Sequence, residues 1–173
     1  MRRLLLLAVV LQLGGCSCGR QPPVEAAAPV PSSGQATAAS DPAAAERAQA
    51  AQALADNYQD LALAASTLHS YLAAVAGKDW NKADTFWTGG KAPPRPDDYA
   101  VRGIEDLGSM RITNRAPEPL DQEIPTRAVE IPVTLLVRGN GGAREIKGWY
   151  RLRRKIDGAG WEITSASMPP SLD

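Results

Sequence analysis

The chain has 173 residues, and its 19 basic side chains are balanced by 19 acidic ones. A nucleic-acid-binding protein normally shows a clear basic excess, so this balance argues against nucleic acid as a partner. The length and the hydrophobic content of 44% are those of one modest globular domain with a tail. Both cysteines, Cys16 and Cys18, precede that domain, so no disulfide can cross-link its core.

The first residues have the composition of a secretory signal peptide. Arg2 and Arg3 precede an apolar run from Leu4 to Leu13, and small residues follow it. The run is too short to cross a bilayer, which needs about 20 apolar residues. An uncleaved anchor helix is therefore a weaker alternative, also because Gln12 interrupts the run.

The stretch Leu13-Gly14-Gly15-Cys16 resembles the lipobox of bacterial lipoproteins. The resemblance implies that residues 1–15 are removed and that Cys16 carries a lipid that anchors the chain to a membrane. Ser17 follows, where an aspartate commonly causes retention in the inner membrane. The resemblance thus implies an outer-membrane lipoprotein facing the periplasm of a Gram-negative envelope. Cleavage before Cys18 is a poorer match, and Cys18 is then either an incidental thiol or a site of intermolecular pairing or second lipidation.

Residues 16–41 are rich in Pro, Ala, Ser, Gly and Gln. Such a segment buries too little apolar surface to offset the entropy cost of ordering it. We expect a disordered tether there, followed by a single domain over residues 42–173 with its core at about 54–168.

A long helix is predicted to open the domain. Asp41 is a suitable N-cap, Pro42 suits the first helical position, and Gly77 suits the end after Ala76. Apolar side chains recur at steps of three and four along one stripe, namely Leu54, Tyr58, Leu61, Ala65, Leu68, Leu72 and Val75. The stripe predicts a helix packed within its own domain. A coiled coil is the alternative, disfavoured by Ala65 and by missing Glu/Lys pairs.

Shorter elements follow this helix. We expect a second helix over residues 81–87, and a third helical turn that starts at Asp97 and Asp98 and runs through residues 99–107. Alternating side chains then predict strands, over residues 109–114, 126–138, 143–155 and 161–168. The glycine-rich segment 139–142 predicts a hairpin turn. Pro132 cannot donate to a ladder, so we expect a bulge or a sheet edge there.

The segments 70–80 and 82–87 resemble the opening helices of nuclear transport factor 2-like (SnoaL-like) proteins, and the segments 146–152 and 160–166 resemble their final hairpin. The resemblance covers residues 59–168. It implies an α+β fold, with a long N-terminal helix and short helices packed on a curved antiparallel sheet of about four strands around a cone-like pocket. The candidate residues for that pocket are His69, Tyr71, Trp87 and Tyr150.

Enzymes of that superfamily place an Asp/His pair, or an aspartate with tyrosine donors, inside the cone. His69 is the single histidine here and lies next to Leu68, where a structural role is the simpler explanation. No HxxxH, HExxH or CxxC spacing occurs, and neither does a G-x-S-x-G or phosphate-loop motif. We therefore expect no catalytic residues, no metal and no cofactor.

The basic run on the 143–155 strand is the candidate interaction patch. Alternation places Trp149, Arg151, Arg153 and Lys155 on one face. Tryptophan flanked by arginine suits an interface anchor, whereas a solvated outer face is the simpler explanation.

Three functions fit these features. The first is a lipid-anchored periplasmic module that binds a protein or envelope component without catalysis. The second is an immunity or inhibitor lipoprotein that neutralises a toxin acting in the periplasm. The third is a small-molecule enzyme that uses the cone pocket, disfavoured by the missing acid/base pair.

Overall fold

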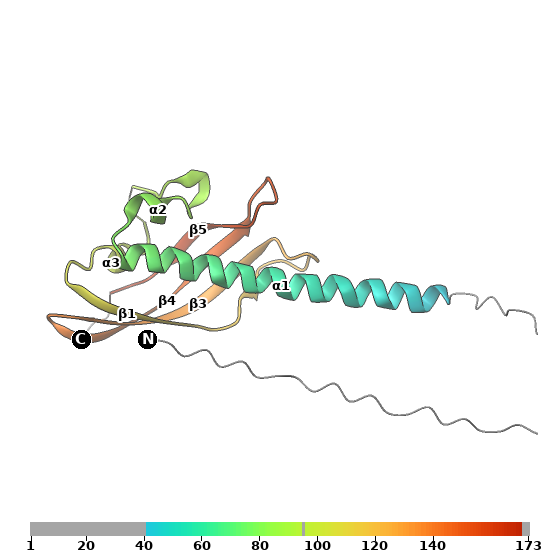
Figure 1. The fold of residues 1–173 in the computed structure, drawn as a ribbon, viewed down its shortest axis with the longest axis horizontal. Coiled ribbons are helices and arrows are strands. Elements are labelled where there is room, and N and C mark those ends of the chain that lie inside the picture. The colour runs from blue at the N-terminus through green and yellow to red at the C-terminus, as the bar shows by residue number, and fades with distance from the viewer. Residues whose placement is uncertain (1–40, 95, 171–173) are drawn as a thin grey trace, which may run out of the picture. The chain divides into compact units, whose positions relative to one another are not determined.

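The computed structural model describes residues 41–94 and 96–170. This part of the chain is α+β: a helix packs on an antiparallel sheet of five strands (Figure 1). The elements are α1 (Pro42–Ala76), α2 (Trp80–Asp84), the 3₁₀ turn η1 (Thr88–Gly90), α3 (Tyr99–Arg102), β1 (Leu107–Asn114), β2 (Glu118–Pro119), β3 (Ala128–Gly139), β4 (Gly142–Arg154) and β5 (Trp161–Ser167). The predicted signal peptide, Cys16 and nearly all of the predicted tether lie outside the described residues.

The two ends of α1 are set by local chemistry. The Asp41 carboxylate accepts a hydrogen bond of 3.0 Å from the amide of Ala43, and Pro42 is the first helical residue, as predicted. At the other end Gly77 is the cap residue, but Lys78 takes the left-handed conformation, with φ of 56°. The amide of Lys78 then reaches the Val75 carbonyl at 2.9 Å, which closes the last turn.

Only the second half of α1 carries core side chains. Its buried residues are Ala64, Leu68, Tyr71, Leu72, Ala74 and Val75. The predicted stripe is wrong at its start, because Leu54 is 46% exposed and Tyr58 is 72% exposed. The N-terminal turns of α1 extend beyond the strands (Figure 1), which accounts for the exposure of Leu54. At the turn of Tyr58 the helix does meet the rest of the fold, but through Asn57, whose side chain accepts a hydrogen bond of 2.7 Å from the amide of Thr126.

The two short helices differ from the predicted ones. Helix α2 starts one residue early, at Trp80, with Asp79 as its cap, and ends at Asp84. It ends there because the chain turns to pair with β5, where the amide of Ile163 donates to the Phe86 carbonyl at 2.8 Å. Helix α3 ends at Arg102, five residues before the predicted end, since the chain turns there into β1.

The sheet has the order β1-β3-β4-β5, and β2 also pairs with β3. The face toward α1 carries the sheet's core side chains, among them Val129, Ile131, Val133, Leu135, Val137, Ile146, Tyr150 and Leu152. The alternate residues form the opposite face, which we call the outer face. The period of two predicted both faces, and the ends of β1, β3, β4 and β5 lie within two residues of the predicted ones, whereas the short strand β2 was not predicted.

Pro132 does not lie at a bulge and β3 is not an edge strand, but the predicted sheet edge is present locally at this residue. Strand β3 lies between β1 and β4, and its register with β4 passes through the Pro132–Trp149 pair without a shift. The Pro132 carbonyl accepts from the amide of Arg115 at 3.0 Å, on the β1 side. Because N and C=O of one residue point the same way in an antiparallel ladder, the proline nitrogen faces the place where β1 has ended at Asn114. No ladder bond is lost there.

We predict that Gly148→Ala destabilises the fold, because a Cβ at this position would collide with the carbonyl oxygen of Ser167 and the sulfur of Met168. The free energy of unfolding should fall by about 1–3 kcal/mol in chemical denaturation. Gly141→Ala is the matched control, since a Cβ there meets nothing within 4 Å. Equal stability of the two variants would contradict this packing.

Candidate functional site

A buried carboxyl group joins three elements of the fold. Asp98 is 0% exposed, and its Oδ2 accepts hydrogen bonds from the hydroxyls of Tyr71 on α1 and Tyr150 on β4, the latter at 3.0 Å. Asp98 precedes α3, but its side chain does not cap that helix. The carboxyl therefore ties the start of α3 to α1 and to the middle of the sheet.

Aromatic rings surround this carboxyl. The ring of Tyr71 packs edge-to-face on Tyr150 at 5.7 Å and on Trp87 at 6.0 Å between centroids. Within the described chain, Asp98 Oδ1 and Trp87 Nε1 are buried without a hydrogen-bond partner. A buried carboxylate with one bare oxygen is costly, so the neutral acid is favoured here.

Burial raises the pKa of Asp98 above its ordinary value of 3.8, and the two tyrosine hydroxyls oppose that rise only in part. Burial and the adjacent carboxyl likewise raise the pKa of Tyr71 and of Tyr150. The tyrosines therefore stay neutral donors, and the group whose charge changes with pH is Asp98.

We call Asp98, Tyr71, Tyr150 and Trp87 the buried cluster, and Arg102 connects this cluster to the surface. Its guanidinium donates to the Tyr71 hydroxyl at 3.4 Å and pairs with the Asp84 carboxylate at 2.7 Å. The same group lies over the ring of Trp80, 5.2 Å from its centroid. Trp80 is 38% exposed, so this ring lies at the surface and not in the core.

Three of the four predicted pocket residues come together, but the structure separates the fourth. Tyr71, Trp87 and Tyr150 pack against one another in the core. His69 is exposed and pairs with Asn114 at the end of β1, 2.7 Å between Nε2 and Oδ1. Five hollows lie among the described residues, and Tyr71, Trp87 and Tyr150 are not in the lining of any of them. These rings fill the core around Asp98, and they do not line an open pocket.

The predicted interaction patch is partly assembled on the outer face. The guanidinium of Arg151 lies 4.5 Å from the centroid of Trp149 and pairs with Glu130 on β3 at 2.9 Å. Arg153 pairs with Glu162 on β5 at 2.7 Å. Lys155 follows the end of β4 and lies in the turn before β5, so it does not extend the row.

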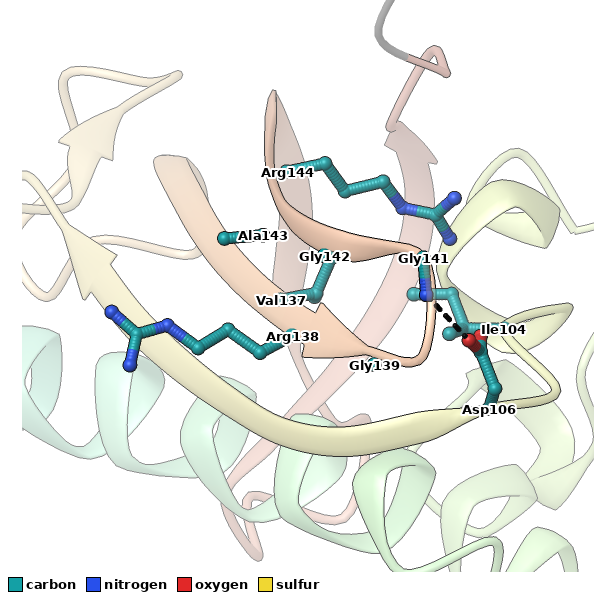
Figure 2. Close-up of a pocket in the computed structure, with 9 residues that line it drawn as sticks. All are labelled: Ile104, Asp106, Val137, Arg138, Gly139, Gly141, Gly142, Ala143 and Arg144. Carbon is teal, nitrogen blue, oxygen red and sulfur yellow. Dashed lines mark hydrogen bonds between the residues drawn. The ribbon is translucent and has the colours of Figure 1, made fainter.

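The glycine-rich segment is the hairpin turn between β3 and β4, as predicted. Gly139 pairs with Gly142, and the amide of Gly141 donates to Asp106 Oδ2 at 3.3 Å (Figure 2). A hollow of about 220 Å³ lies beside this turn. Figure 2 shows Arg138 and Arg144 extending from the hairpin in opposite directions, so they do not converge on one ligand.

A larger hollow, of about 550 Å³, opens beside the end of β5. We call it the Tyr99–Trp149 hollow after its two aromatic residues. Its other lining residues are Pro96, Asp97, Ala166, Ser167, Met168 and Pro169. Tyr99 is 63% exposed. Of this set the sequence singled out only Trp149 for binding. The other lining residues were missed, because nothing in the order of residues indicates that residues 96–99 lie beside the end of β5.

The part of the chain that the structure describes contains no helix that is both long and apolar enough to cross a membrane. The same residues contain no group of three or more His, Cys, Asp or Glu side chains placed to hold a metal ion.

In comparisons with protein-family models, curated proteins and solved structures, none matches the chain. Evidence about function therefore comes from the chain's own residues and their geometry.

We predict that Asp98→Asn changes how stability depends on pH. The folded wild type keeps the Asp98 proton at pH values where the unfolded chain has lost it, so this group stabilises the fold fully below its ordinary pKa. That contribution falls as the pH rises through the raised pKa, by up to about 1.4 kcal/mol per pH unit, whereas the amide variant lacks this slope.

Urea denaturation between about pH 4 and pH 8 measures the effect, since this window covers the pKa values of shifted carboxyl groups. The stability deficit of Asp98→Asn relative to wild type should shrink as the pH rises. Asp97→Asn is the matched control, because it makes the same chemical change at the neighbouring residue, whose side chain is exposed. Parallel curves for wild type and Asp98→Asn would show that Asp98 does not titrate in this range.

Proposed function

We propose that the chain is a lipid-anchored binding module of a bacterial envelope, that it faces the periplasm, and that it acts without catalysis. The residues that resemble a lipobox support the anchor at Cys16. The partner is a protein or another component of the envelope. A domain held at a membrane by one end meets its ligands through the surface that it presents, so the site of binding must be sought there.

The observation that carries the proposal is the stacked pair Trp149–Arg151 on the outer face. Cation–π stacking and the ion pair with Glu130 hold the arginine in one position, while its side chain is still 46% exposed. Tryptophan and arginine contribute most to binding when they are fixed before the partner arrives, since less entropy is then lost. By contrast, the buried group Asp98 has no exposed surface on which a substrate can bind.

The resemblance to nuclear transport factor 2-like proteins belongs to this proposal as well. A helix on an antiparallel sheet supports it at the level of fold class. The cone-like shape, and membership of that superfamily, are proposals that rest on the sequence pattern. Because that fold carries enzymes and non-enzymatic modules alike, the fold class does not decide between them.

We predict that Cys16→Ser moves the protein from the membrane fraction to the soluble fraction of cells that express the full chain. The serine cannot form the thioether that carries the lipid. Cys18→Ser is the matched control and should leave the protein in the membrane fraction. Membrane retention of Cys16→Ser would contradict the lipid anchor.

We predict that a photo-cross-linking amino acid at position 153, on the outer face beside Arg151, captures a partner in cells. The same amino acid at Leu63, which is 56% exposed on α1, should capture far less. Trp149→Ala should lower capture at position 153 by roughly tenfold, the usual effect of removing an anchor residue. Equal capture from both positions would contradict a binding role for the outer face.

A further inference from the structure

The Tyr99–Trp149 hollow begins at the same tryptophan as the proposed contact face, and its walls come from distant parts of the chain. Tyr99 comes from the first turn of α3 and Trp149 from β4, while Ser167 lies at the end of β5. Its volume of about 550 Å³ lies within the range of small-ligand sites, roughly 300–1,000 Å³.

The two aromatic residues of the hollow differ in exposure, since Tyr99 is exposed and Trp149 is half-buried. Tyr99 is 63% exposed, and within the described residues its hydroxyl has no side-chain hydrogen bond. The Arg151 guanidinium covers one face of Trp149, and the same ring also lines the hollow. An exposed tyrosine beside an oriented tryptophan offers flat apolar area with polar edges.

The polar groups of the hollow narrow the class of ligand. Asp97 supplies a carboxylate and Ser167 a hydroxyl, and neither side chain makes a hydrogen bond to another described residue. A carboxylate repels anions and accepts hydrogen bonds from hydroxyl groups. A proline-rich peptide also suits aromatic walls, but its prolines have no N–H to donate to Asp97.

We propose that the Tyr99–Trp149 hollow binds a glycan, with a sugar ring stacked on an aromatic wall and its hydroxyls donating to Asp97. Pyranose rings present C–H groups on their faces and hydroxyls around their edges, which matches flat apolar walls with acceptors beside them. The inference deepens the proposed function, on which it rests for the binding role, by naming a glycan as the envelope component.

The buried cluster holds this site in place. Asp98 lies between Asp97 and Tyr99 in the sequence, and its carboxyl is bonded to two tyrosines in the core. The carbonyl of Asp97 also accepts from the amide of Met168 at 3.2 Å. The loop is thus fixed at two successive residues, so a ligand does not have to order it on binding.

The test is saturation-transfer NMR on the full chain in detergent micelles. The probes are the trisaccharide of N-acetylglucosamine, cellotriose, and a proline-rich decapeptide. We expect at least one sugar to bind with Kd of about 1 mM, a normal strength for a shallow site. Transfer should be strongest to the protons on one face of a sugar ring.

Variants separate binding from folding. Tyr99→Ala and Trp149→Ala should each weaken sugar binding by roughly tenfold, whereas Tyr99→Phe should keep it, because the ring is retained. Tyr58→Ala removes a tyrosine that is 72% exposed on α1 and should have no effect. Asp97→Asn should weaken binding less than Tyr99→Ala does.

Three outcomes would overturn the inference. The first is that no saturation is transferred to either sugar, and the second is that Tyr58→Ala weakens sugar binding as much as Tyr99→Ala does. The third is that the proline-rich peptide binds and neither sugar does. If neither sugar binds but the cross-linker at position 153 still captures a partner in cells, the glycan proposal is wrong and the proposed binding function stands. If neither sugar binds and no partner is captured, the proposed function is wrong as well.

Discussion

The hydrogen-bonded carboxyl of Asp98 is the interaction on which the rest of the structure depends. A carboxyl group removed from water is stable in a core only if its oxygens find donors or if it keeps its proton. Tyr71 lies 27 residues before it and Tyr150 lies 52 residues after it, so satisfying one side chain fixes α1, the start of α3 and β4 together. Apolar packing alone is less selective, since similar side chains can exchange places with little loss.

The hydrogen bonds of Asp98 also affect the surface, because its two neighbours in the sequence, Asp97 and Tyr99, both line the Tyr99–Trp149 hollow. The side chain of Asp98 is buried, whereas Asp97 and Tyr99 on either side of it are exposed and line the hollow together with Trp149. The end of β5 closes the remaining side and is pressed against Gly148, the one position in β4 where a side chain would strike it. The shape of the hollow therefore depends on core packing, through the buried carboxyl of Asp98 and the contact at Gly148.

The elements that follow from local pattern were predictable, and those that follow from tertiary contacts were not. The period of two located β3, β4 and β5 to within two residues, and the Asp41 cap, the Gly77 stop and the 139–142 turn are properties of short segments. The sheet edge predicted at Pro132 is only local, because it depends on where the neighbouring strand β1 ends. The exposed positions Leu54 and Tyr58 were misjudged because a helix pattern reveals neither how far the sheet beneath it extends nor which side of each turn faces the fold. The role of Asp98 had no local signal, because both of its partners are distant in the sequence.

If the proposed lipid anchor holds the protein at a membrane, a shallow site suits it for a physical reason. Confinement raises the local concentration of ligands on nearby surfaces, so a contact of modest strength is occupied when several such proteins share one surface. An open hollow with exposed Tyr99 also lets the ligand leave quickly, which suits repeated contact with a long polymer. A deep catalytic cleft would require the core around Tyr71 and Tyr150 to open, and that would expose the carboxyl on which the fold depends. A binding surface outside a closed core avoids this conflict.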